Sequence, residues 1–124
     1  MSQRAVLLTS DLIFSTKVTG TARALGLEIA VAADLEKATE LCRGEPPGCV
    51  FIDLGIPGLE ITSVVSRLRS ATGTARTVAY GSHVDKARLD QARVAGCDEV
   101  LPRSKFSAKL PDLLRRYLAA PQHT

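Results

Sequence analysis

The side chain with the clearest chemical potential in this sequence is the carboxylate of Asp53. Asp53 ends a short apolar run that starts at Cys49, and a loop containing Pro57 and Gly58 follows it. A run of this length and composition is typical of a buried strand. In open α/β sheets, ligands bind outside the carboxyl ends of the strands. Asp53 therefore marks a candidate functional site.

Other polar groups also follow apolar runs in this chain, in the same way that Asp53 does. If these runs are parallel strands, right-handed crossovers bring all their carboxyl ends to one edge of the sheet. We therefore expect these groups to gather around Asp53. They are Thr9, Ser10 and Asp11 after the first run, Gly81, Ser82 and His83 after the fourth, and Arg103 with Ser104 after the fifth.

The elements that must position these groups alternate between strand-like and helical patterns. Strands are predicted at 5–8, 27–32, 49–53, 77–80 and 98–101, and helices at about 11–25, 34–42, 59–70 and 85–96, with a last helix that ends near Leu118 or Ala119. Alternating βα units predict an α/β fold, in which a five-stranded parallel sheet lies between two layers of helices.

Several local details follow from cap and breaker residues. Thr9 or Ser10 is expected to cap the first helix, with Asp11 complementing the helix dipole in its first turn. Gly20 is expected to allow close packing of that helix. The start of the last helix is left open: Ser107 could cap it, and Pro111 fits only within its first turn.

Length and composition limit the classes of protein that are possible. The 124 residues suffice for one domain, which we place at 1–119 with a frayed tail at 120–124. A net charge of +3 with few aromatic residues does not indicate nucleic-acid binding.

The cysteines and the apolar segments indicate neither a metal site nor a membrane protein. Cys42, Cys49 and Cys97 show no metal-site spacing and are expected to be buried thiols. No segment predicts a signal peptide or a membrane span, so we expect a cytoplasmic protein without membrane contact.

Three segments together resemble response-regulator receiver domains, which have a flavodoxin-like (βα)5 fold. The resemblance covers essentially the whole chain and implies signal transduction, two-component signalling and phosphorelay chemistry. Its motifs are Asp53-Leu54-Gly55-Ile56-Pro57-Gly58-Leu59-Glu60, then Thr77 to Asp85, then Ala95-Gly96-Cys97-Asp98-Glu99-Val100-Leu101-Pro102.

The resemblance also assigns site positions, and several of them depart from the family pattern. Asp53 takes the phosphoacceptor position. The acidic pair that holds Mg²⁺ with the acceptor falls on the neutral residues Thr9 and Ser10, and Asp11 comes one residue late. The switch Thr or Ser falls on Gly81, with Ser82 beside it, and the conserved Lys of the family falls on Arg103. Only a weak Mg²⁺ site at Asp53, Ser10 and Asp11 is therefore conceivable.

This pattern predicts an atypical, stand-alone receiver that is not an enzyme, needs no cofactor and works through protein–protein contacts. Its partner would be a histidine kinase or a separate effector chain, because the sequence shows no output domain, and a homodimer through the fourth and fifth helices is a further expectation. Two alternatives stay open: a phosphorylatable receiver that uses Asp53, and a small flavodoxin-like cofactor-binding protein or enzyme. The last lacks support from a Gly-rich phosphate loop or a nucleophile–base motif.

Overall fold

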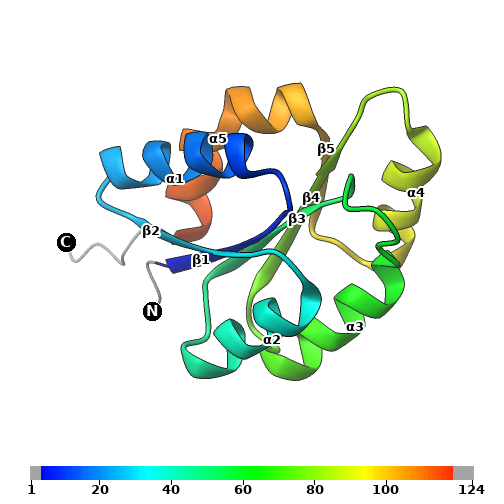
Figure 1. Cartoon of the computed structure of the whole chain (residues 1–124), viewed down its shortest axis with the longest axis horizontal. Coiled ribbons are helices and arrows are strands. Elements are labelled where there is room, and N and C mark those ends of the chain that lie inside the picture. Colours follow the sequence, from blue (N-terminus) through cyan, green and yellow to red (C-terminus); the bar gives the residue numbers. More distant parts are fainter. Residues whose placement is uncertain (1–3, 119–124) are drawn as a thin grey trace.

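In the computed structural model, which describes residues 4–118, one parallel sheet of five strands lies between two layers of helices (Figure 1). The strand order is β2-β1-β3-β4-β5. The elements in chain order are β1 (Arg4–Leu8), α1 (Leu12–Ala24), β2 (Glu28–Ala32), α2 (Leu35–Gly44), β3 (Cys49–Asp53), α3 (Ile61–Ala71), β4 (Arg76–Gly81), α4 (Lys86–Ala95), β5 (Glu99–Pro102) and α5 (Arg103–Leu118). The predicted α/β, flavodoxin-like fold is confirmed. The predicted tail at 120–124 lies outside the described residues.

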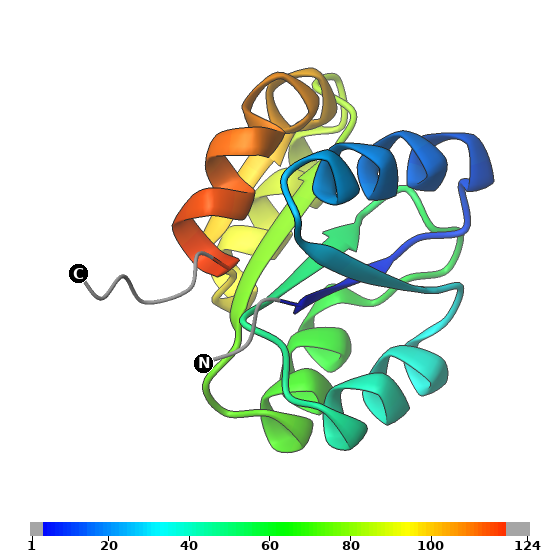
Figure 2. The same ribbon diagram turned by 90° about the vertical axis from the view of Figure 1, so that its left-hand side faces the viewer.

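Each inner strand is apolar on both faces because each face is covered by helices. All five residues of the central strand β3 are buried, whereas the edge strand β2 is largely half-buried or exposed. Alternation along the strands divides the side chains between two cores. One core lies under α2, α3 and α4, and the other lies under α1 and α5, as the two layers in Figures 1 and 2 show.

The core under α1 and α5 contains an aromatic cluster. The Tyr80 ring stacks on the Phe106 ring with centroids 4.3 Å apart, and the Phe14 and Phe51 rings lie 5.3 Å from Tyr80 and 5.2 Å from Phe106, respectively. These contacts fix α1 and α5 side by side against the ends of β3 and β4. The helices that carry Asp11 and Arg103 are thereby held at the edge where Asp53 lies.

The helix α5 begins at Arg103, directly after β5, and contains Pro111 in its interior. Ser107, which was one possible cap, therefore lies inside the helix, and the expectation that Pro111 lies in its first turn is wrong. A proline inside a helix lacks its N–H and crowds the carbonyl four residues earlier, so it bends the helix. Figure 2 shows the first turns of α5 nearly end-on and the later turns running down the sheet. Burial of apolar side chains along α5, from Phe106 to Leu118, outweighs the local preference of Pro111.

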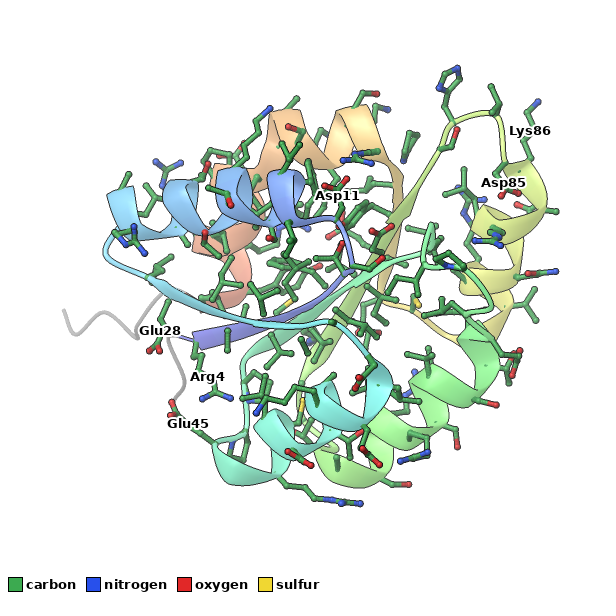
Figure 3. All side chains as sticks on the ribbon, viewed as in Figure 1. Arg4, Asp11, Glu28, Glu45, Asp85 and Lys86 are labelled. Carbon is green, nitrogen blue, oxygen red and sulfur yellow. The ribbon has the colours of Figure 1, made fainter. Side chains whose placement is uncertain are left out.

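The opposite edge of the sheet, at the amino ends of the strands, is held by Arg4. Its Nη2 atom donates to the backbone oxygen of Leu41 at 2.8 Å, and its Nη1 atom lies 3.4 Å from Glu45 Oε1. Figure 3 shows Arg4 between Glu28 and Glu45, far along the strands from Asp11. These charges belong to the packing of β1 on α2, and the candidate chemistry lies at the other edge.

Candidate functional site

Asp53 and Thr9 meet at the carboxyl edge of the sheet. Leu8 of β1 is paired with Ile52 of β3, so the residues that follow, Thr9 and Asp53, are adjacent. Alternation places both side chains on the α1 and α5 side. The Thr9 hydroxyl donates a hydrogen bond of 2.7 Å to Asp53 Oδ2. The neutral residue at the position of a receiver's first acidic residue is thus a direct partner of the acceptor-position carboxylate.

The second carboxylate oxygen of Asp53 is also occupied. Gly55 donates its backbone N–H to Asp53 Oδ1 at 2.8 Å. Asp53 is only 7% exposed. A buried carboxylate needs donors for its oxygens, and here the chain itself supplies one for each. The loop after β3 therefore closes back onto the carboxylate.

Asp11 caps α1 and binds Arg103. Its Oδ1 atom accepts a hydrogen bond of 2.9 Å from the Phe14 N–H, which makes Asp11, rather than Thr9 or Ser10, the cap of this helix. Its Oδ2 atom lies 2.7 Å from Arg103 Nη2. The pKa of the Asp11 carboxyl is lowered, first by the Phe14 N–H and then by Arg103. Figure 3 shows Asp11 at the start of α1.

Arg103, at the position of the conserved lysine, does not pair with Asp53. Its guanidinium carbon lies 4.2 Å from the centroid of the Phe14 ring, so the guanidinium is held between this ring and Asp11. A cation over an aromatic face and beside a carboxylate is doubly stabilised. The Asp11 N–H in turn donates to Thr9 Oγ1 at 3.1 Å. Arg103 is thus linked to Asp53 through the side chain of Asp11, the backbone N–H of Asp11 and the hydroxyl of Thr9.

The sequence alone does not show whether the Tyr80 side chain points into the core or outward. In the structure it lies in the core beside this network. It is fully buried and is paired with Asp53 across β3 and β4. Burial raises the pKa of its hydroxyl, and the carboxylate of Asp53 raises it further. The hydroxyl makes no hydrogen bond of normal geometry to any of residues 4–118. Tyr80 therefore acts mainly as a packing residue under the site.

Gly81 occupies the position of the switch hydroxyl, and Leu54 leaves little space beside it. A Cβ atom built on Gly81 would lie 3.2 Å from Leu54 Cβ and 3.4 Å from Leu54 Cδ1. The neighbouring Ser82 is exposed, and its Oγ accepts a long hydrogen bond of 3.4 Å from the Val84 N–H. Apolar packing fills the place where receivers carry a hydroxyl.

Arg88 also reaches the site, although the sequence pattern does not predict it. It extends from α4 and donates to the backbone oxygen of Leu54, in the loop directly after Asp53. Its Nε atom also lies 3.4 Å from Asp85 Oδ2, and Asp85 caps α4. The only sequence signal is a basic residue three positions after an acidic cap, which is common on helices.

The remaining candidates stand apart from the carboxylate network. Ser10 and His83 are exposed, Cys42 and Cys49 are buried, and Cys97 is half-buried with a pKa raised by burial to about 11. Within residues 4–118, no three His, Cys, Asp or Glu side chains are grouped to hold a metal ion. No helix in this part of the chain is long and apolar enough to cross a membrane.

Solved structures with the same arrangement of strands and helices include receiver domains. A response regulator receiver domain from Bermanella marisrubri superposes with a TM-score of 0.82 at 21% identity, covering 95% of this chain and 99% of that one. The receiver domain of a sensor histidine kinase from Pseudomonas aeruginosa, which has a magnesium ion in its active-site cleft, gives a TM-score of 0.79 at 18% identity over 97% of this chain and 100% of that one. The chain has the fold of a response-regulator receiver domain.

At the level of sequence, the chain resembles a transcriptional activator. No protein-family model matches the chain. The transcriptional activator protein ExaE of Pseudomonas putida is 29% identical over 94 residues, which are 76% of this chain. The chain spans 44% of the length of that relative. The receiver fold is thus retained on a sequence that has diverged widely.

Proposed function

We propose that the protein is an atypical receiver module for signal transduction, which acts through protein–protein contacts with little or no Mg²⁺-dependent phosphorylation of Asp53. One observation carries the proposal: Asp53 is engaged on both oxygens, by the Thr9 hydroxyl and the Gly55 N–H. The acceptor position is kept as a structural anchor of the loop after β3.

The donor set around Asp53 fits a magnesium ion poorly. Mg²⁺ requires oxygen ligands in octahedral geometry, usually from one or two carboxylates together with water and substrate oxygens. Asp11, the other carboxylate of the network, accepts a hydrogen bond from the Phe14 N–H on one oxygen and pairs with Arg103 through the other. Phosphoryl transfer depends on such positioning and charge neutralisation. Without the ion, an incoming phosphoryl group would meet an unneutralised carboxylate at Asp53.

The partner of such a module would be another protein chain. The similar receiver domain from Pseudomonas aeruginosa belongs to a sensor histidine kinase, so a kinase or a separate effector is the kind of partner we propose. Several large apolar side chains are available for contact: Leu12 and Ile13 at the start of α1, and Val84 and Val94 beside and on α4. A homodimer through α4 and α5 stays a prediction.

The proposal is tested by amide NMR spectra of the protein titrated with Mg²⁺ and beryllofluoride, an analogue of the phosphoryl group. We expect almost no Mg²⁺-dependent shifts at Asp53 or Gly55, because the oxygens of Asp53 already have donors. The matched control is the double variant Thr9→Asp with Ser10→Asp, which restores the acidic pair and should gain Mg²⁺-dependent shifts at the same amides. Saturable shifts of the natural sequence at Asp53 that require Mg²⁺ would overturn the proposal and favour a phosphorylatable receiver at Asp53.

A further inference from the structure

A surface groove lies beside the Asp53 network, between α1, the loop after β4 and the first turns of α5. Its volume is about 540 Å³. Asp53 does not line it, so the proposed role of Asp53 does not require a ligand in it. Figures 1 and 2 show α1 and α5 lying side by side along this part of the molecule. The groove is lined by Phe14, Lys17, Ser82, His83, Arg103, Ser104 and Ser107.

The charge of this groove is positive. Lys17 and Arg103 contribute to its wall, and none of the residues of 4–118 that line it is acidic. Lys17 is exposed and has no ion pair with another residue of 4–118. Arg103 uses one nitrogen for Asp11, at 2.7 Å, and its guanidinium is held against Phe14. One cation is therefore free to move onto a ligand, and the other is already fixed in orientation.

The uncharged part of the groove consists of short hydroxyl side chains and an aromatic edge. Ser82, Ser104 and Ser107 bring hydroxyl groups from two different elements. Hydroxyl donors beside Lys and Arg are suited to the oxygens of a phosphate group, which accept several charge-assisted hydrogen bonds. The first turn of α5 has no acidic residue that would oppose an anion. The volume leaves room for an organic group beyond the phosphate itself.

We propose that this groove binds a small phosphate ester, with the phosphate held by Lys17 and Arg103 and by the serine hydroxyls. The groove is joined to Asp53 by the hydrogen bonds from Arg103 through Asp11 and Thr9. A ligand that takes a share of the Arg103 guanidinium weakens its bond to Asp11. Binding in the groove is thereby transmitted to the loop after β3 without any chemistry at Asp53.

The test uses amide NMR titrations of the whole chain without Mg²⁺, at constant ionic strength kept with sodium chloride. Inorganic phosphate and phenyl phosphate are the two probes, because they separate free phosphate from a phosphate ester. We expect saturable shifts at Ser82, His83 and the amides of 103–107, with tighter binding of phenyl phosphate, and a smaller shift at Gly55. Equal affinity for the two probes would overturn the ester as the ligand, and shifts that grow linearly without saturation would overturn the site.

Two surface variants decide whether the groove is responsible. Lys17→Ala removes the unpaired cation of the groove and should weaken binding about tenfold, as the loss of one charge-assisted hydrogen bond does. Lys105→Ala is the matched control: Lys105 is also an exposed lysine, in the first turns of α5, but it does not line the groove. It should change affinity by less than about twofold. An equal loss in both variants would show non-specific attraction to a basic surface and contradict the proposal.

Discussion

At the scale of single residues, the hydroxyl of Thr9 is the main difference between this site and a metal-binding receiver site. It donates to Asp53 and accepts from the Asp11 N–H, so one side chain joins two parts of the edge. A carboxylate at the same position would repel Asp53 unless a cation lay between them. The hydroxyl of Thr9 instead joins Asp53 and Asp11 by hydrogen bonds, with no cation between the side chains of Thr9 and Asp53.

Replacing Thr9 by valine tests this role of the hydroxyl. Thr9→Val keeps the shape of the buried side chain and leaves Asp53 Oδ2 without its donor. We expect a loss of about 1–3 kcal/mol in the free energy of unfolding, the usual cost of an unsatisfied buried polar group. Urea unfolding followed by circular dichroism measures it. Ser10→Ala, at an exposed neighbouring position, should change stability by less than about 0.5 kcal/mol, and equal effects of the two variants would contradict the role of Thr9.

The ion pair between Asp11 and Arg103 gives the second residue-scale prediction, which concerns pH. The pKa of the Asp11 carboxyl lies below its ordinary value of 3.8 in the folded protein. A lowered pKa means that the carboxylate stabilises the fold above pH 3.8 and that this stabilisation is lost as the pH falls through the folded pKa. Asp11→Asn should therefore be less stable than the natural protein above pH 3.8, and the gap should shrink in stronger acid.

This pH dependence is measured by urea unfolding at a series of pH values. Asparagine is as good a helix cap as aspartate, so Asp11→Asn removes the charge but keeps the acceptor for the Phe14 N–H. Asp11→Ala removes both and serves as the comparison; it should stay less stable than the natural protein even in acid. A gap for Asp11→Asn that widens on acidification would show that the charge of Asp11 does not stabilise the fold.

At the scale of elements, the sequence predicted strands well because each inner strand is a short apolar run closed by a polar residue. Asp53 and the groups that follow β1, β4 and β5 come to one edge by topology alone, so their gathering was also predictable. The pairing within that edge was not. Nothing in the spacing shows that Arg103 binds Asp11 rather than Asp53, because this depends on where the Phe14 ring fixes the guanidinium.

The errors at the element scale have tertiary causes. The local preference of proline favours a helix that starts near Pro111. The helix α5 nevertheless starts at Arg103, because the apolar side chains along α5 are buried on the sheet. Gly20 was expected to mark close packing in α1, yet a Cβ atom at Gly20 would meet nothing within 4 Å. A glycine in the sequence shows only that no side chain is needed at that position. Whether neighbouring atoms occupy the place of a Cβ atom can be seen only in the structure.

The open space around Gly20 leads to a prediction for α1. Glycine in a helix interior is less favourable than alanine by about 0.5–1 kcal/mol, so Gly20→Ala should raise the free energy of unfolding by this amount. Gly26, just after the same helix, is the matched control because its φ of 74° is strained for any residue with a Cβ atom. Gly26→Ala should therefore destabilise. Thermal unfolding of both variants measures the contrast, and changes of the same sign would contradict this account of α1.

At the scale of the whole molecule, the single sheet separates two cores that share the strands but not the side chains. Every phenylalanine, together with Tyr80 and Tyr117, packs with the core under α1 and α5. The core under α2, α3 and α4 is built from aliphatic residues and small side chains. The sequence contains no tryptophan and two tyrosines. The near-ultraviolet signal of the protein therefore reports on one face of the sheet alone.

This asymmetry allows a test of whether the two faces unfold together. Leu68 is buried in the aliphatic core, and Leu68→Ala should cost about 2–5 kcal/mol by leaving a cavity there. Because β1, β3 and β4 contribute side chains to both cores, we expect one cooperative transition, as in most single domains of this size. The near-ultraviolet tyrosine transition on the opposite face should then shift to lower urea as far as the far-ultraviolet helix transition does. Leu113→Ala, in the aromatic core, should shift both signals in the same way.

The contradicting outcome is a tyrosine transition that stays in place in Leu68→Ala while the helix transition shifts. Such a result would show that the two faces unfold separately. A partner bound to one face would then leave the stability of the other face unchanged.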